Sequence, residues 1–217
     1  MSELTKRIFF GAIYVVIMWF GTLYSETTFS LLFLFLGLGA LYEMWKLRKG
    51  KSKLLALLFV LTPFFIVQLF GITDHNYPEK EFNPSIILLM FVLTWTFDSF
   101  AYLIGKKFGK TKILPNISPK KSWEGFAGGL FFSIIASSIL YFSFSTYFNN
   151  ISNIAYILIS IVLPFTATTG DFIESYYKRK AGVKDSGKIM PGHGGILDRM
   201  DAFLITIPVI YIIINLT

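Results

Sequence analysis

The stretch KDSGKIMPGHGGILDRMD, residues 184–201, concentrates charge and glycine in a chain that is 54% hydrophobic and only 15% charged. Within it, Asp198 and Asp201 are three residues apart, a spacing that places both carboxylates on one face of a helix. Two adjacent carboxylates repel each other unless a cation lies between them, and oxygen ligands of this kind suit Mg²⁺. We therefore expect a magnesium site; the alternative is that Arg199 and nearby lysines neutralise the pair.

Further polar residues precede this stretch. Asp171 ends a long apolar run, and Ser175 and Lys178 follow it at helical spacing. Asp171 and Asp185 are therefore candidates to complete the cluster. The chain contains no cysteine, which excludes a thiolate metal site.

The glycines of the PGHGG segment indicate a backbone that approaches a ligand closely. Gly192, Gly194 and Gly195 can adopt positive φ, and successive amides in such a segment form an anion-binding nest. His193 lies between them, where it either donates to a phosphate oxygen or has no function. The plain alternative for the segment is a flexible loop.

A second polar group begins inside an apolar run, in TWTFDSFAYLIG. A carboxylate near the centre of a bilayer costs at least about 2.5–3.5 kcal/mol, so Asp98 must face other helices or a water-filled cavity. Helical spacing places Asp98, Tyr102 and Gly105 on one face. We expect this face to line a polar cavity; the alternative is a structural hydrogen bond to a neighbouring helix.

The segment SPKKSWEG predicts the start of another helix. Pro119 cannot continue a helix from within, Ser122 is suited to cap the helix that follows, and Glu124 falls in its first turn. Lys120 and Lys121 lie just before that amino end. Free amides and two ammonium groups there form a phosphate-binding corner.

Carboxylates for a metal, together with cations and amides for phosphates, favour phosphoryl or nucleotidyl transfer, which depends mainly on positioning and electrostatic stabilisation. No GxxxxGK[ST] motif occurs, so the chain is not a P-loop enzyme. Because the polar segments adjoin apolar runs, we expect a lipid substrate at the membrane surface.

Seven apolar runs must position these groups. A membrane span needs roughly 17 to 25 residues, and because an unpaired amide is costly in lipid we expect the runs to be helices. A barrel would need alternation, which SLLFLFLGLGAL lacks. The predicted fold is an all-α polytopic integral membrane protein with about seven transmembrane helices. The runs are 8–24, 29–45, 54–72, 85–104, 126–144, 154–169 and 202–216, of which the last two are short and either extend into adjacent polar segments or are shielded by protein.

The basic residues indicate the orientation of these helices. Of the 20 lysines and arginines, 19 lie in the amino-terminal segment and in the second, fourth and sixth connections. These segments share one side if seven helices alternate, so the positive-inside rule places the amino terminus in the cytoplasm and the carboxyl terminus outside. The same distribution argues against nucleic acid as a partner, although the net charge is +7. A secretory signal peptide is the weaker interpretation of the first run, because no small-residue cleavage pattern follows.

The segment SYYKRKAGVKDSGKIMPGHGGILDRMD closely resembles the signature of phosphatidate cytidylyltransferases, also called CDP-diacylglycerol synthases. That signature reads S-x-x-K-R-x-x-x-x-K-D-x-G-x-x-x-P-x-H-G-G-x-x-D-R-x-D. It is carried here by Ser175, Lys178, Arg179, Lys184, Asp185, Gly187, Pro191, His193, Gly194, Gly195, Asp198, Arg199 and Asp201. The stretches D-x-x-A-Y-x-x-G and S-P-K-K-S-x-E-G also resemble the family, so the resemblance covers residues 95–205.

The resemblance implies that CTP and phosphatidate react to give CDP-diacylglycerol and pyrophosphate, with Mg²⁺ as cofactor and a second cation left open. Asp171, Asp198 and Asp201 would hold the metal. The implied catalytic residues are these three acids with Lys178, Lys184, Asp185 and Arg199. The implied substrate-binding residues are Asp98, Ser118, Lys120, Lys121, Glu124, Ser175, Arg179, His193, Gly194 and Gly195.

We expect the protein in the inner (cytoplasmic) membrane, with an active site facing the cytoplasm. The fourth and sixth connections and the adjacent helix ends would form that site. Residues 1–84 would be amino-terminal transmembrane helices and residues 85–217 the catalytic membrane region. Membrane lipids and a second copy of the chain, in a homodimer, are the expected partners beside the two substrates.

Two other functions remain open at this point. A CTP-dependent lipid kinase, such as a polyprenol kinase, would release CDP in place of pyrophosphate. A multi-pass transporter would use Asp98 on an ion path, but transporters often show paired interrupted spans in related halves, and no such repeat is apparent.

Overall fold

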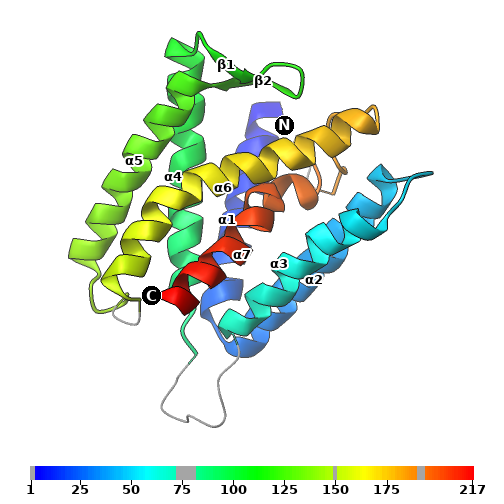
Figure 1. Ribbon diagram of the computed structural model, residues 1–217. Helices are drawn as coiled ribbons and strands as arrows, with labels where there is room; N and C mark the ends of the chain where they lie inside the picture. The colour runs from blue at the N-terminus through cyan, green and yellow to red at the C-terminus, as the bar shows by residue number, and fades with distance from the viewer. Residues whose placement is uncertain (1–2, 72–81, 149–150, 190–193) are drawn as a thin grey trace.

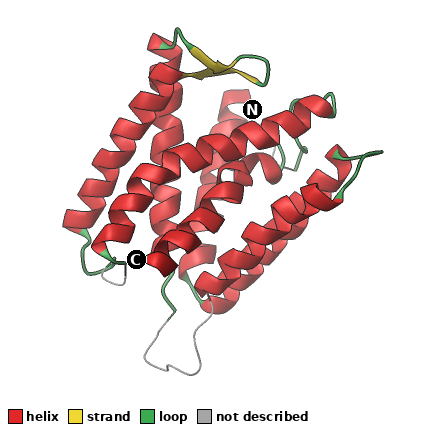
Figure 2. Ribbon diagram, in the orientation of Figure 1, coloured by secondary structure: helices red, strands yellow, loops and turns green. Residues whose placement is uncertain are grey.

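The structure is a computed structural model that describes residues 3–71, 82–148, 151–189 and 194–217. Within those residues the secondary structure consists of seven helices and one short hairpin (Figure 2). In chain order these are α1 Glu3–Leu23, α2 Glu26–Leu47, α3 Leu54–Gly71, α4 Ser85–Phe108, β1 Lys112–Leu114, β2 Ser118–Ser122, α5 Trp123–Ser143, α6 Asn153–Lys180 and α7 Leu197–Leu216. The seven predicted helices are therefore confirmed.

Five of the helices, α2 to α6, are long and apolar enough to cross a membrane. Large apolar side chains on their outer faces are exposed, among them Phe35, Phe65 and Phe142. Extended apolar surface of this kind is expected where a helix faces lipid instead of water. The chain is an all-α, multi-pass membrane protein, as the sequence predicts.

Successive helices run in opposite directions, which brings the polar segments to one end of the molecule. Figure 1 shows the β1–β2 hairpin and the N-terminus at one end and the C-terminus at the other. The hairpin joins the antiparallel helices α4 and α5, and the segment 181–196 joins α6 to α7. Both polar segments of the sequence are therefore connections between antiparallel neighbours.

Serine residues are the N-caps of three helices, α2, α5 and α6. Ser25, Ser122 and Ser152 each accept the N–H of the residue three positions later, at 3.1, 3.2 and 3.0 Å. Such a cap satisfies one of the N–H groups that a helix start leaves without an intrahelical partner. The cap at Ser122 confirms the helix start predicted from SPKKSWEG.

The helices formed by the two short runs extend into the adjacent polar segments, which is one of the two alternatives left open by the sequence. α6 continues past its predicted end at Thr169 to Lys180, and α7 begins at Leu197, ahead of its predicted start. The added turns carry charged side chains that pair with one another between the helices, as described below. The antiparallel hairpin, in which Lys112 lies opposite Ser122, was not predicted.

One apolar core joins the amino-terminal helices to the rest of the chain. The ring of Phe91 on α4 lies 5.3 Å from that of Phe203 on α7 and 6.5 Å from that of Phe33 on α2, between centroids. All three side chains are buried. The predicted division at residue 84 stays a prediction, and the core continues across it.

Candidate active site

Three carboxylates converge between α6 and α7, and we call Asp171, Glu174 and Asp201 the acidic cluster. Each contributes one oxygen that lies within 4.8 Å of the others. Glu174 is fully buried, and its Oε1 has no hydrogen-bond partner among the described residues. A buried carboxylate oxygen without a donor, beside two further carboxylates, fits a hard divalent cation such as Mg²⁺.

Close helix packing produces this convergence. A Cβ added to Gly170 on α6 would collide with the backbone carbonyl of Asp201 on α7, so only glycine allows the observed approach. One turn away from the cluster, the buried hydroxyls of Thr166 and Thr206 lie 2.9 Å apart. These contacts place Asp171 opposite Asp201.

The sequence analysis identified Asp171 and Asp201 for this cluster but missed Glu174. The available signal was its position three residues after Asp171 on a helix, the same spacing that identified Asp198 and Asp201. Helical spacing was applied to Ser175 and Lys178 in this stretch but not to Glu174, although all three lie on α6.

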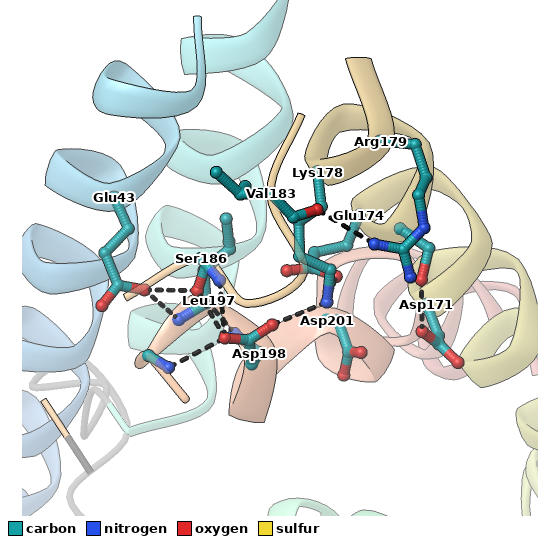
Figure 3. Close-up of polar contacts among 12 residues, drawn as sticks. Glu43, Asp171, Glu174, Lys178, Arg179, Val183, Ser186, Leu197, Asp198 and Asp201 are labelled. Carbon is teal, nitrogen blue, oxygen red and sulfur yellow. Dashed lines mark hydrogen bonds and ion pairs between the residues drawn. The ribbon is translucent and has the colours of Figure 1, made fainter. Parts of the chain in front are cut away.

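Asp198 lies outside the acidic cluster, so the predicted ligand set of Asp171, Asp198 and Asp201 shares two residues with the cluster and stays a prediction. Its Oδ1 accepts a 2.6 Å hydrogen bond from Nζ of Lys178, whose ammonium also pairs with Glu174 (Figure 3). Its Oδ2 accepts the N–H groups of Ser186 and Gly195, both at 2.8 Å. Asp198 therefore holds Lys178 and the loop before α7, and pairing with a lysine was the alternative left open from the sequence.

The glycine-rich segment before α7 is partly described. Gly194 has φ +81°, as predicted for this segment, whereas His193 lies outside the described residues. The amide of Gly195 donates to Asp198, and the amides of Ile196 and Leu197 donate to Glu43 on α2. Within the predicted anion-binding segment, the amide of Gly195 is thus bonded to a carboxylate of the chain, and the phosphate nest as a whole stays a prediction.

A cavity of about 560 Å³ lies between α4, α5 and the hairpin. Asp98, Tyr102 and Gly105 line it from one face of α4, as their helical spacing predicts. Ser118 and Lys120 line it from β2. The volume falls in the range of small-molecule sites, and the wall combines apolar surface with a few polar groups.

Lys121 connects this cavity to the acidic cluster. Its side chain lines the cavity and forms an ion pair with Asp171. Burial by itself would lower the pKa of Lys121, but the carboxylates of Asp171, Asp98 and Asp201 together raise it above the ordinary value for lysine. The ammonium group is therefore a fixed positive charge between the two parts of the site.

Glu124 supports the hairpin from the first turn of α5. Its carboxylate accepts the N–H of Lys110 at 3.1 Å and that of Thr111 at 3.0 Å. The N–H of Trp123 in turn donates to the carbonyl of Thr111 at 2.9 Å. Glu124 thus fixes the segment that leads into β1, and a direct contact with a nucleotide stays a prediction.

The remaining predicted residues lie around the ends of α6 and α7. Ser175 donates to Oδ1 of Asp171 at 3.2 Å, and Arg179 donates to the carbonyl of Val183 at 2.9 Å. Lys184 and Asp185 are exposed in the segment after α6, and Arg199 is half-buried in the first turn of α7. Asp185 was a predicted candidate to complete the acidic cluster. The cluster found among the described residues consists of Asp171, Glu174 and Asp201.

These elements form a site with two functional parts. A cavity with lysines and a carboxylate on its wall can accept a phosphorylated ligand, and the acidic cluster beside it can hold a divalent cation. Cations and a metal that converge on phosphate oxygens stabilise phosphoryl and nucleotidyl transfer. The geometry therefore favours a reaction at phosphorus.

Known proteins resemble the chain along nearly its whole length. A model of the cytidylyltransferase family matches residues 6–217. The phosphatidate cytidylyltransferase of Rickettsia typhi is 36% identical over 210 residues, which are 94% of this chain and 89% of that protein. The phosphatidate cytidylyltransferase of Thermotoga maritima is 36% identical over 225 aligned residues, 100% of this chain and 80% of that protein. That of Staphylococcus aureus is 47% identical over 140 residues, 64% of this chain and 52% of that protein.

Proposed function

Because the chain belongs to the cytidylyltransferase family, we propose that it transfers the cytidylyl group of CTP to phosphatidate. It is an enzyme, a nucleotidyltransferase of phospholipid synthesis, and its products are CDP-diacylglycerol and pyrophosphate. The observation that carries the assignment to this site is the position of Lys121, which belongs to the cavity wall and also pairs with the acidic cluster.

The reaction needs no strong general base from the protein. A phosphate oxygen of phosphatidate, already anionic at neutral pH, attacks the α-phosphorus of CTP. The bond from that phosphorus to the bridging oxygen breaks, and pyrophosphate leaves with the electron pair. The main barrier is the approach of two polyanions, which fixed cations reduce by placing positive charge beside the phosphate oxygens.

Asp171, Glu174 and Asp201 would hold Mg²⁺. When bound, a divalent cation supplies charge that offsets the phosphates and polarises their oxygens. This set has Glu174 in place of Asp198, because both oxygens of Asp198 accept hydrogen bonds whereas Oε1 of Glu174 has no partner among the described residues. A second cation stays an expectation from the resemblance.

The cations of the chain are proposed to bind the phosphates. Lys120 and Lys121 on β2, with Ser118, would contact CTP in the cavity that Asp98 also lines. Arg179, Lys184 and Arg199 lie at the ends of α6 and α7, where they can meet the phosphates of either substrate.

We further propose that this end of the molecule faces the cytoplasm in the inner membrane. The basic connections lie at the same end as the hairpin, and the positive-inside rule assigns such ends to the cytoplasmic side. CTP is then supplied directly from the cytosol. A homodimer, the assembly expected from the sequence, is tested by light scattering of the purified protein in detergent.

The deciding experiment incubates the purified protein with CTP labelled in the base, phosphatidate and Mg²⁺, and identifies both products by mass. We expect CDP-diacylglycerol and pyrophosphate in equal amounts. Release of CDP with a phosphorylated lipid would identify a kinase instead, and uptake into vesicles without CTP consumption would identify a transporter. The control omits phosphatidate, so that hydrolysis of CTP is measured separately.

A further inference from the structure

A buried carboxylate on α2 contacts the loop that precedes α7. Glu43 lies near the C-terminal end of α2, in the amino-terminal segment to which the sequence analysis assigned no chemistry, and its side chain is only 2% exposed. Burial of a carboxylate costs free energy unless hydrogen-bond donors surround it, so the donors around Glu43 identify the part of the structure that it stabilises.

Three donors from one short region converge on this carboxylate. Oε1 accepts the N–H of Ile196 at 3.1 Å, and Oε2 accepts the N–H of Leu197 at 2.9 Å. Oε2 also accepts the hydroxyl of Ser186 at 2.8 Å (Figure 3). Ile196 is the N-cap of α7 and Leu197 is its first residue, so Glu43 holds the start of the helix that carries Asp198 and Asp201.

The loop is shaped around Glu43. A Cβ added to Gly187 or to Gly195 would collide with the carboxylate oxygens of Glu43. Both glycines are fixed positions of the segment that resembles the family signature, and the contact gives a physical reason for glycine at each. The loop backbone therefore closes directly onto the carboxylate.

A chain of short contacts runs from Glu43 to the acidic cluster. The hydroxyl of Ser186 lies 2.8 Å from Glu43 and also 2.8 Å from Oδ2 of Asp198. Asp198 accepts from Lys178, and Lys178 pairs with Glu174. Displacement of the loop from α2 would therefore move Asp198, and with it the lysine that borders the cluster.

We infer that Glu43 is a positioning residue of the reaction, which anchors the loop and the start of α7 so that Lys178 and the acidic cluster keep their arrangement. This inference rests on the proposed function and extends it to an amino-terminal helix with no residue in the cavity wall or the cluster. Glu43 acts through the loop and does not touch substrate. Removal of supporting partners around a metal site typically costs about 10–100-fold in metal affinity or activity.

The test compares Glu43→Gln and Glu43→Ala with wild type and with Phe33→Ala. The glutamine variant keeps the volume and one acceptor oxygen but turns an amide NH₂ toward donors, whereas the alanine variant removes every acceptor. Phe33 is a buried residue of α2, about 15 Å from Glu43 along the helix, and its truncation destabilises the core without contact with the loop.

Two kinds of measurement are made on each purified protein. The first is hydrogen–deuterium exchange in peptides that cover residues 182–189 and 194–201. The second is kcat, KM for CTP and the half-saturating Mg²⁺ concentration, each referred to the folded fraction. For Glu43→Gln we expect faster exchange in both peptides, a fall in kcat/KM of about 10–100-fold and a raised Mg²⁺ midpoint. Glu43→Ala should show the same changes more strongly, and Phe33→Ala should lower only the melting temperature.

Unchanged exchange in Glu43→Gln would overturn the anchor, and unchanged kinetics with faster exchange would overturn its role in the reaction. The same kinetic loss in Phe33→Ala would reduce Glu43 to a general contribution to stability. A wild-type protein that makes no CDP-diacylglycerol would refute the proposed function and with it the positioning role, while the exchange measurement would still decide the anchor.

Discussion

Lys121 on the β1–β2 hairpin forms an ion pair with Asp171 on α6, which links the wall of the cavity to the acidic cluster. The two residues come from the two polar segments of the sequence, one between α4 and α5 and the other around the α6–α7 connection. Their contact brings the predicted phosphate-binding lysine to the predicted metal ligand. The protein therefore has one site, to which both segments contribute.

Removal of the Lys121 ammonium should impair turnover more than it impairs folding. For Lys121→Ala we expect kcat/KM for CTP to fall about 100-fold or more, the scale found when one preorganised electrostatic group is removed. The half-saturating Mg²⁺ concentration should not rise, because Asp171 loses a competing cation. The measurement is steady-state kinetics over a CTP and Mg²⁺ grid.

Lys51→Ala is the matched control for this prediction. Lys51 is exposed in the turn after α2, at the basic end of the molecule but away from the cavity wall. Its removal should leave kcat/KM near the wild-type value. Equal losses in the two variants would mean that general positive charge, and not the position of Lys121, supports the reaction.

The direction in which the pKa of Lys121 is shifted determines how its contribution to activity depends on pH. The carboxylates of Asp171, Asp98 and Asp201 overcome the effect of burial and raise the pKa of Lys121 above its ordinary value. Its contribution to stability and binding is then complete below the ordinary lysine pKa and is lost only as pH rises through the higher folded-state value. We expect the ratio of wild-type to Lys121→Ala activity to stay constant between about pH 7 and pH 9.

Lys121→Arg provides the comparison, since a guanidinium stays charged throughout this range. A ratio of wild-type to Lys121→Ala activity that declines between about pH 7 and pH 9, with no such decline for the arginine variant, would show that burial dominates and that Lys121 loses its proton early.

Sequence patterns were sufficient for the seven helices and for the positions of several polar side chains. Apolar runs of span length located all seven helices, and the i, i+3 and i, i+4 spacings placed Asp98 on the cavity wall and Asp171 beside Ser175. These inferences succeeded because they depend on helix geometry, which is local.

The features that were missed depend on contacts between distant residues. Glu43 lies in the predicted run 29–45, so the argument used for Asp98 also applied to it, but no local pattern identifies its partner Leu197, 154 positions away. The three-residue strand β1 is too short to show alternation. Lys178 pairs with both Glu174 and Asp198, so the presence of Glu174 and not Asp198 in the cluster depends on the packing of α6 on α7, which a local pattern does not show.

The metal ligand set can be tested by neutral substitutions at four acids. Asp171→Asn, Glu174→Gln and Asp201→Asn should each raise the half-saturating Mg²⁺ concentration by about tenfold or more, since loss of even a supporting partner has an effect of that size. Asp198→Asn should lower turnover through Lys178 and the loop, with a smaller change in the Mg²⁺ midpoint. The readout is activity against Mg²⁺ concentration at saturating CTP.

Circular dichroism and the melting temperature of each variant control for folding in that series. A large midpoint shift for Asp198→Asn together with none for Glu174→Gln would restore the set of Asp171, Asp198 and Asp201 expected from the resemblance. Activity that persists undiminished in a chelator would reject a divalent cation at this site altogether.

The close approach of α6 and α7 makes Gly170 a site where one methyl group should disturb the chemistry. In Gly170→Ala the new Cβ meets the backbone carbonyl of Asp201, so the helices must separate or the backbone must shift. Overpacking of this kind costs about 1–3 kcal/mol, and the displacement falls next to Asp171 and Asp201. We expect a lower melting temperature, lower turnover and a raised Mg²⁺ midpoint together.

Thr169→Ala, one position earlier on the exposed face of α6, should change none of the three. Wild-type values in Gly170→Ala would mean that the helices tolerate a wider separation than the structure indicates, and that the acidic cluster does not depend on it.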